Sequence, residues 1–268
     1  MKMLMVERNL AGFSVDILKK IEQATFIEEE AFKGDMEIIK HDKYSYAGFL
    51  SNVDQTEKFF VKCYKPKNAL NRALVRLGIS RPHRSFNIAR HIEGWFPISS
   101  PVALVINSCS LNTYYFSTHI DGDSMSDLVK RSDCKPEYRE AVISKVGQQL
   151  AKFHQQGWLH GDLKWSNIVI CGEFNVDINE VFFIDLDGAK PVRVFGKNNG
   201  RGRDLARFIV NCEDYHVDAR VVDRFIDAYA NGIDSSYKRC VRMAAPSLKK
   251  LRKRHDKKYG LRNKSSRY

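Results

Sequence analysis

The 268-residue sequence lacks several features that would define its class at once. No stretch reaches the roughly 18 uninterrupted apolar residues that a membrane-spanning helix requires, and the apolar part of the N-terminus is too short for a signal peptide. The six cysteines include no Cys-x-x-Cys pair, so we expect reduced thiols rather than a zinc site or a disulfide framework. These absences predict a cytoplasmic protein. With 43% apolar residues, the chain can bury a full core.

The most informative stretch is Leu159–Ile170, which contains the pattern His-x-Asp-x-x-x-x-Asn followed by an apolar strand. This pattern is typical of the catalytic loop of protein-kinase-like phosphotransferases. Phosphoryl transfer needs a carboxylate that orients the attacking hydroxyl and accepts its proton, and an oxygen ligand for Mg²⁺ close by. Asp162 fits the first role and Asn167 the second. His160 is expected to be structural, packing and hydrogen-bonding to fix the loop backbone.

Two further motifs lie in the order that such an enzyme requires. The apolar strand at 181–184 ends in Asp185, where a kinase places its main metal-binding aspartate, and Asp187 follows two residues later without an assigned role. Upstream, Lys62 lies inside a short apolar strand and is predicted to bind the α- and β-phosphates of ATP. Taken alone, Lys62 could face solvent and the aspartates could be turn residues, but the ordered set favours the kinase interpretation.

The predicted elements indicate an α+β, two-lobed, protein-kinase-like fold. Residues 1–120 form the N-lobe, an antiparallel sheet plus a helix in the second half of 65–90, and residues 121–268 form a mostly helical C-lobe. The strands are predicted at 36–40, 46–50, 59–62, 102–106 and 114–120. Apolar residues at helical spacing over 137–156 predict the helix before the catalytic loop. A hairpin is predicted at 171–180, and Asp204 is expected to cap a helix that begins near 201.

A nucleotide pocket is predicted where the sheet ends. Backbone groups around His119, Ile120 and Asp121 would bind an adenine edge, with Phe60 and Val169 as apolar walls, although plain core packing is an open alternative for these two side chains.

Two parts of the kinase pattern are not settled by the sequence. The turn before Gly48, Asp42 to Ser45, is where a phosphate-covering loop would lie, but it contains no glycine. The helix residue that would pair with Lys62 is Glu93, Asn87 or absent.

Together these residues resemble the bacterial lipopolysaccharide core kinase family over roughly residues 35–230. The motifs that carry the resemblance are Phe60–Tyr64, Ser85–Asn87, Pro97–Leu104, His160–Ile168, Ile184–Asp187 and Arg203–Arg207. The catalytic loop is also similar to those of RIO-type kinases, the small kinase of the KEOPS complex and aminoglycoside phosphotransferases. Reaction class is therefore better defined than substrate.

The resemblance implies an ATP- and Mg²⁺-dependent enzyme that phosphorylates a heptose or Kdo sugar of the lipopolysaccharide inner core. It would work in the cytoplasm, at the inner face of the Gram-negative inner membrane. By the same resemblance, Lys164 would neutralise charge on the γ-phosphoryl group during transfer, and Asp204 would fasten the backbone of the catalytic loop. Only 18 residues lie between Asp185 and Asp204, without an Ala-Pro-Glu motif, which argues against a conventional protein kinase. An atypical small protein kinase and a nucleotide-binding pseudokinase remain as alternatives.

The positive charge is concentrated at the C-terminus. Residues 249–268 hold ten Lys or Arg against the single acid Asp256, which gives 10 − 1 = +9 of the net +12. We interpret this segment as a basic tail that is either simply solvated or attracted to an anionic membrane surface. Nucleic acid is not expected as a partner, because no aromatic stacking motif or known binding fold is present.

Overall fold

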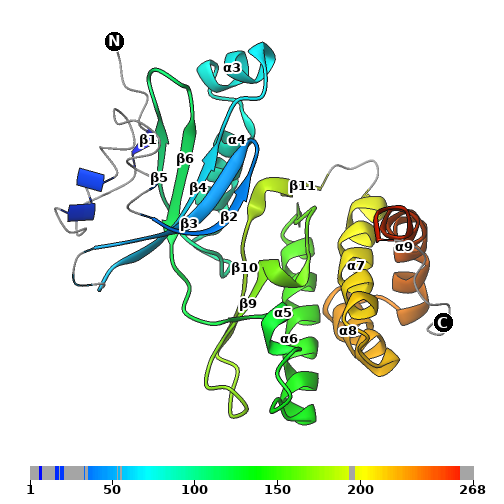
Figure 1. Cartoon of the computed structure of the whole chain (residues 1–268). Helices are drawn as coiled ribbons and strands as arrows, with labels where there is room; N and C mark the ends of the chain where they lie inside the picture. Colours follow the sequence, from blue (N-terminus) through cyan, green and yellow to red (C-terminus); the bar gives the residue numbers. More distant parts are fainter. Residues whose placement is uncertain are drawn as a thin grey trace. The chain divides into compact units, whose positions relative to one another are not determined.

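The computed structural model describes residues 36–52, 54, 56–192 and 197–259, together with short stretches at 6–7, 16–17, 19–20 and 33 (Figure 1). The chain divides into two compact units, Met1–Ile120 and Asp121–Tyr268. The first is an antiparallel sheet with helices and the second is mostly helical, so the predicted α+β, kinase-like fold class is confirmed.

The first unit is built on one antiparallel sheet with the strand order β1-β5-β6-β4-β3-β2. Its strands are β1 (Val6–Glu7), β2 (Glu37–Asp42), β3 (Ser45–Ser51), β4 (Lys58–Tyr64), β5 (Pro101–Ile106) and β6 (Thr113–Thr118). The five predicted strands are confirmed within a few residues. The two-residue β1, which pairs with β5 at the sheet edge, was not predicted.

Strand β4 contributes side chains to both faces of the sheet, and Lys62 lies on the less buried one. Phe59, Val61 and Cys63 point into the main apolar cluster, whereas the alternate residues Phe60 and Lys62 are only half-buried. Side chains alternate between the two faces of a strand, so this pattern follows directly from the sequence. Lys62 therefore lies on the face opposite the main core of the unit.

Two helices follow β4, where the sequence predicted one. Helix α4 (Arg81–Ile92) is the predicted helix, and Phe86 packs its ring edge-on against Tyr115, the β6 residue that faces Lys62 in the register. Helix α3 (Ala69–Arg76) was not predicted. Its N-terminus is capped by the side chain of Asn68, which accepts a hydrogen bond from the Asn71 amide.

The second unit contains five helices among its described residues. These are α5 (Met125–Leu128), α6 (Pro136–Gln155), α7 (Lys197–Asp214), α8 (Ala219–Gly232) and α9 (Tyr237–Tyr259). Helix α8 packs against α6 and α9 packs against α7 (Figure 1). The predicted helix at 137–156 is confirmed as α6. Helix α7 begins at Lys197, somewhat earlier than expected, so Asp204 lies in its interior and the predicted capping role is wrong.

Short strands hold the loops that connect these helices. The strands are β7 (Asp123–Ser124), β8 (Trp158–Leu159), β9 (Ile168–Cys171), β10 (Glu180–Phe183) and β11 (Lys190–Pro191). They form a three-stranded sheet in the order β10-β9-β7 and a β11-β8 pair. The antiparallel pairing of β9 with β10 confirms the hairpin predicted at 171–180. No described helix has the length and apolar character needed to cross a bilayer.

The predicted basic tail is partly a packed helix. Residues 249–259 belong to α9, and Leu248 and Leu251 pack against Ala206 and Val210 of α7. The apolar residues recur at helical spacing among the lysines, which is why this half folds onto the unit instead of remaining a solvated tail. Residues 260–268 lie outside the described residues.

Candidate functional site

The catalytic loop runs from β8 to β9 and ends in a single 3₁₀ turn, Trp165–Asn167. The side chain of Asp162 is 33% exposed, whereas Asn167 is buried. Asn167 donates its amide Nδ2 to the Asp162 carbonyl oxygen at 3.0 Å. Because only the amide nitrogen makes this bond, the Oδ1 atom of Asn167 can serve as an oxygen ligand.

His160 is fully buried and links the catalytic loop to the strand that precedes Asp185. The Asp162 amide donates to its Nδ1 at 3.3 Å, so this nitrogen is an acceptor and Nε2 carries the proton. Nε2 then donates to the Ile184 carbonyl oxygen at 3.2 Å. Burial lowers the pKa of His160, which favours this neutral form. The structural role predicted for His160 is confirmed.

Asp185 is held beside the catalytic loop in an unusual backbone conformation. The Ile184 amide donates to the Asn167 carbonyl oxygen at 3.0 Å, which brings the two predicted metal ligands together. Asp185 itself has φ 58° and ψ 64°, in the left-handed region that non-glycine residues seldom occupy. Such conformations cost on the order of 1 kcal/mol or more and cluster at functional sites.

Two glycines allow the Asp185 loop to approach the catalytic loop closely. Gly161 has φ 76°, and a Cβ atom there would lie 2.2 Å from the Gly188 carbonyl oxygen. A larger residue at 161 would therefore separate the two loops. Asp187 lies in the 3₁₀ turn Leu186–Gly188, directly after the predicted metal ligand Asp185.

Asp204 of α7 holds the catalytic loop through two backbone amides. Its carboxylate is fully buried and accepts hydrogen bonds from the amides of His160 and Gly161, each at 2.8 Å, and from His154 Nε2 at 3.2 Å. Burial alone would raise the pKa of Asp204, but the hydrogen bonds from His154 and the Gly161 amide outweigh it and lower the pKa. The fastening role that the resemblance implied for Asp204 agrees with these contacts.

The same face of α7 contacts the loop at two further points. Arg207 Nη1 lies 2.8 Å from Asp162 Oδ1, and Asn211 Oδ1 accepts a hydrogen bond from the Trp165 amide at 2.8 Å. Asp204, Arg207 and Asn211 are spaced i, i+3, i+7, which places them on one side of a helix. The sequence interpretation did not assign roles to Arg207 and Asn211, because their spacing places them on the side of Asp204 but does not show that this side meets the loop.

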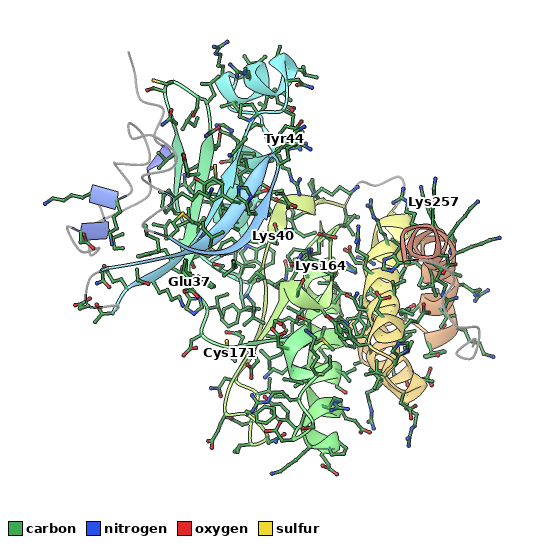
Figure 2. All side chains as sticks on the ribbon, in the orientation of Figure 1. Glu37, Lys40, Tyr44, Lys164, Cys171 and Lys257 are labelled. Carbon is green, nitrogen blue, oxygen red and sulfur yellow. The ribbon has the colours of Figure 1, made fainter. Side chains whose placement is uncertain are left out.

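Two cations flank the proposed catalytic carboxylate. Besides Arg207, the ammonium of Lys164 lies 3.8 Å from the other Asp162 oxygen, Oδ2. The Lys164 side chain is 38% exposed and is labelled in Figure 2. Two cations beside this partly exposed carboxylate can also attract an anionic phosphoryl group.

The predicted nucleotide-binding residues of the first unit gather on the half-buried face of the sheet. The Phe49 ring lies 6.1 Å from Phe60 and 4.9 Å from His119. Phe60 is half-buried and is not part of the main apolar cluster. The Lys62 ammonium lies 5.4 Å from the Tyr64 ring centroid. Of its candidate partners, Asn87 is exposed on α4 and Glu93 is the C-cap of that helix.

The remaining predicted pocket residues lie where one unit ends and the next begins in the chain. Ile120 is the last residue of the first unit and Asp121 the first of the second. Asp121 accepts a hydrogen bond from the Cys171 thiol, and Val169 is buried in β9. A Cβ atom at Gly122 would lie 2.5 Å from the Ile170 carbonyl oxygen, so this short connection requires glycine.

The close packing of β3 on β2 explains the isolated glycine near the predicted phosphate-covering loop. A Cβ atom at Gly48 would lie 2.3 Å from the Glu37 carbonyl oxygen of the neighbouring strand. Gly48 is therefore required by close strand packing. A phosphate-covering role for the Asp42–Gly48 hairpin stays a prediction.

The oxygen atoms of Asn167 and Asp185 suit a magnesium ion. Magnesium prefers hard oxygen ligands and is commonly held by one or two protein carboxylates together with substrate phosphates and water. Among the described residues, no group of three or more His, Cys, Asp or Glu forms a metal cluster. Two protein ligands, one of them an amide, match a site that the nucleotide itself would complete.

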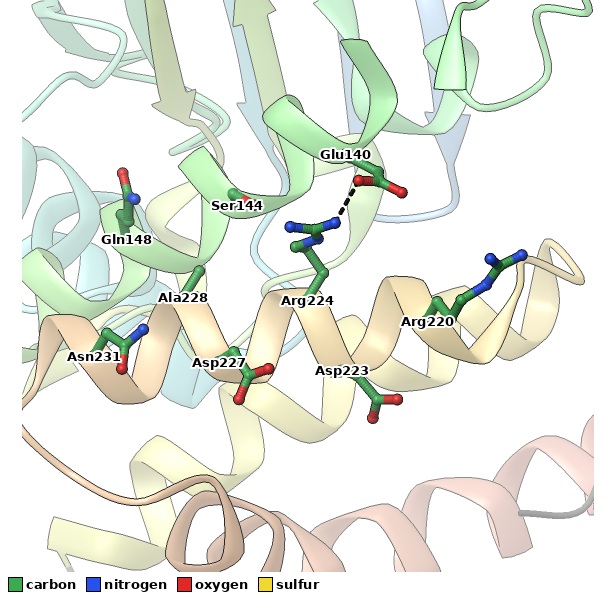
Figure 3. A pocket seen from close by; sticks show the side chains of 9 residues that line it. All are labelled: Glu140, Ser144, Gln148, Arg220, Asp223, Arg224, Asp227, Ala228 and Asn231. Carbon is green, nitrogen blue, oxygen red and sulfur yellow. Dashed lines mark hydrogen bonds and ion pairs between the residues drawn. The ribbon is translucent and has the colours of Figure 1, made fainter. Parts of the chain in front are cut away.

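The second unit also contains a pocket between α6 and α8 (Figure 3). Its lining carries both signs of charge, including Asp223 and Asp227, and Arg224 pairs across it with Glu140. None of the predicted site residues lines it. The candidate site is therefore the catalytic loop with its neighbours, not this helix–helix seam.

We predict that Asp204→Asn destabilises the protein by about 3 kcal/mol at pH 7, because an amide cannot accept from both loop amides as a carboxylate does. The lowered folded-state pKa of Asp204 stabilises the protein above about pH 4, and this stabilisation is lost as the pH falls through the folded-state value. The difference from wild type should therefore shrink in acid. Urea unfolding from pH 7 to about pH 3 measures it.

The matched control is Asp177→Asn, which alters an exposed aspartate that accepts one backbone hydrogen bond from Glu173. It should change the free energy of unfolding by less than about 1 kcal/mol. A deficit of Asp204→Asn that stays constant across this pH range would contradict the proposed hydrogen-bonding role of the carboxylate.

Comparisons with known proteins agree with this geometry. Residues 121–229 match the model of the Lipopolysaccharide kinase (Kdo/WaaP) family. The chain is also 28% identical over 105 residues to the KEOPS complex subunit Bud32 of Pyrococcus abyssi, an alignment that covers 39% of this chain and 44% of that protein. The chain thus matches less than half the length of this relative. Over residues 121–229 the chain is thus similar to the lipopolysaccharide kinase (Kdo/WaaP) family, which is the family that its motifs resemble.

Proposed function

We propose that the protein is an ATP-dependent kinase that transfers a phosphoryl group to an alcohol acceptor. The observation that carries this proposal is the close association of Asp162, Asn167 and Asp185 through the loop backbone, with His160 and Asp204 fixing that backbone from both sides. Phosphoryl transfer depends mainly on positioning and electrostatic stabilisation, and this arrangement supplies both.

Each proposed site residue has a specific task. Asp162 orients the acceptor hydroxyl and receives its proton, while Lys164 compensates charge on the transferring group. Lys62 holds the nucleotide phosphates. Asn167 and Asp185 would hold Mg²⁺, which neutralises phosphate charge when it is bound.

Adenine recognition is assigned to residues near the end of the β6 strand. Backbone groups at His119, Ile120 and Asp121 would bind its edge, with Phe60 and Val169 as apolar contacts. The division of the chain into an N-lobe at 1–120 and a C-lobe at 121–268 is part of the same proposal.

The acceptor that the family match supports best is a heptose or Kdo sugar of the lipopolysaccharide inner core. The short connection from Asp185 to Asp204 supports a sugar over a peptide, because a peptide substrate needs an extended binding platform. An atypical protein kinase is the second candidate, which the similarity to Bud32 favours. A nucleotide-binding pseudokinase is the non-enzymatic alternative, but the complete set of Asp162, Asn167 and Asp185 argues against it.

We predict that Asp162→Asn lowers phosphoryl transfer by about 10²- to 10⁴-fold while nucleotide binding is retained, because only the proton-accepting carboxylate is lost. The measurement is transfer from labelled ATP to Kdo- and heptose-containing core acceptors, with mass spectrometry of the product. Glu180→Gln, an exposed carboxylate at the start of β10, is the control and should transfer like wild type.

Equally low transfer by wild type and Asp162→Asn, with nucleotide still bound, would favour the pseudokinase. Transfer to protein substrates but to neither sugar would favour the atypical protein kinase.

We predict that Arg207 positions the Asp162 carboxylate through their 2.8 Å ion pair. Arg207→Gln should lower kcat by about 10- to 100-fold, because misplacing a reacting group costs that much, and Arg207→Lys should recover part of the loss. The KM for ATP should change little. In an Asp162→Asn background, Arg207→Gln should add almost nothing, since both changes remove the same interaction. Independent, multiplying effects would show that Arg207 acts elsewhere.

We also propose that the basic segment 249–268 attracts the protein to an anionic membrane surface. Arg252 faces α7 and pairs with Glu213, whereas Lys249, Lys250, Lys253 and Lys257 are exposed on the other side of α9. Lys257 is labelled on this outer side in Figure 2. A basic face on a folded helix can approach lipid headgroups as a unit, with about 1 kcal/mol for each lysine near the surface.

We predict that changing these four lysines to Gln weakens sedimentation with anionic vesicles at low salt. The difference should disappear at about 0.5 M salt, where charge interactions are screened. These substitutions keep Leu248 and Leu251 in the core, whereas truncation after Pro246 would remove them. Unchanged nucleotide binding and thermal unfolding are the controls, and undiminished vesicle binding at low salt would remove this role from α9.

A further inference from the structure

Helix α3 and the turn that follows it expose large apolar side chains to water. Leu70, Leu77 and Ile79 are 67%, 69% and 54% exposed, and Val75 is the buried residue of α3. Only eight large apolar side chains are exposed across the described residues, and these three of the eight lie within ten consecutive residues. Soluble proteins seldom gather such residues without a partner.

The exposed side of α3 has an ordered arrangement. Leu70, Ala73 and Leu77 are spaced i, i+3, i+7 and form one stripe, while Arg72 and Arg76, spaced i, i+4, lie along its edge. All five are exposed. The buried side is formed by Val75, with the half-buried Asn71 and Leu74 next to it. The helix therefore presents Leu70 and Leu77 outward and beside positive charge, which is the reverse of a helix that packs its apolar stripe on a core.

The charge of this region has one sign. Residues 58–120 contain the single acid Glu93, and Lys67, Arg72, Arg76, Arg81 and Arg84 all lie near or on α3 in the chain. Within the part of the chain that the structure describes, no ion pair engages Arg72 or Arg76. We name Lys67, Leu70, Arg72, Arg76, Leu77 and Ile79 the α3 surface.

We propose that the α3 surface binds an anionic lipid bilayer, with its leucines and Ile79 inserted among the headgroups and its basic residues on lipid phosphates. Charge complementarity selects an anionic partner. The aliphatic side chains select a lipid over nucleic acid, because they neither stack on bases nor hydrogen-bond to base edges. A basic helix with exposed leucines is the arrangement by which proteins lie in the membrane interface.

Tyr44 extends this surface to the β2–β3 turn. The Lys67 ammonium lies 5.1 Å from the centroid of the Tyr44 ring, and the Lys65 amide donates to the Tyr44 carbonyl oxygen at 2.9 Å. Tyr44, labelled in Figure 2 near α3, is 36% exposed. An aromatic ring with a polar tip suits the headgroup region, so this turn would lie at the edge of the lipid contact.

The α3 surface differs from the basic face of α9 in a way that an experiment can separate. The described exposed side of α9 between 249 and 257 is basic, so its attraction to lipid is electrostatic and disappears in high salt. The inserted leucines of α3 act through removal of apolar surface from water, which salt does not screen. Binding that persists in high salt therefore reports on α3.

The test is sedimentation of the full chain with vesicles of phosphatidylcholine, with and without phosphatidylglycerol, at about 0.1 and about 0.5 M salt. Leu70→Ser/Leu77→Ser should weaken binding to the anionic vesicles by about tenfold at both salt concentrations. Arg72→Gln/Arg76→Gln should weaken it mainly at low salt. The matched control is Val176→Ser, which alters a side chain of equal exposure, 66%, in the β9–β10 hairpin and should bind like wild type.

Thermal unfolding verifies that each variant is folded, and all substituted side chains are exposed. Wild-type affinity of Leu70→Ser/Leu77→Ser for anionic vesicles would overturn the proposal, as would an equal loss in Val176→Ser. Equal binding of wild type to vesicles without phosphatidylglycerol would overturn the anionic part. The inference does not rest on phosphoryl transfer, because vesicle binding is measured without ATP and would stand if Asp162→Asn left transfer unchanged.

Discussion

The buried carboxylate of Asp204 is the contact on which the candidate site depends. Two consecutive loop amides, those of His160 and Gly161, have their hydrogen-bonding capacity met by this one side chain. Burying a charge without such partners would cost several kcal/mol, so the carboxylate and the loop stabilise each other only together. His154 extends the contact, because its other ring nitrogen binds the Tyr229 hydroxyl at 2.8 Å. Asp204 thereby ties α6, α7 and α8 to the loop.

This constraint explains how a short loop can hold reactive groups without regular secondary structure. Asp204 fixes the loop backbone through two of its amides, and His160 ties the loop to the next strand by donating to the Ile184 carbonyl oxygen. The strand before Asp185 then has a defined position, and Asp185 can adopt a left-handed conformation that a free loop would not retain. The local strain is compatible with stability because its neighbours are bonded on both sides. Arg207, one helical turn after Asp204, adds a charge where the proposed base needs orientation.

The features that could be predicted from the sequence are those that local pattern dictates. Strand β4 alternates between core and half-buried residues, and the catalytic loop has fixed spacing because its roles are tied to the backbone. Arg207 and Asn211 could not be assigned in this way, since their importance comes from a helix face that meets a loop more than 40 residues earlier in the chain. The packing of residues 249–259 was missed for a related reason. Its lysines dominate the composition, but two leucines at helical spacing decide that it packs on α7.

Helix α3 illustrates the opposite case, in which a clear pattern points away from the core. Its leucines recur at the spacing of an amphipathic helix, and burial against the sheet is the ordinary outcome for such a stripe. Here Val75 is buried instead, and Leu70 and Leu77 remain in water. Exposing these side chains to water is unfavourable for the isolated protein. A partner that covers them would therefore gain the free energy of burying apolar surface that folding leaves unrealised. Because the charged residues of the α3 surface are all positive, a partner that is both anionic and apolar would have the most favourable free energy of binding.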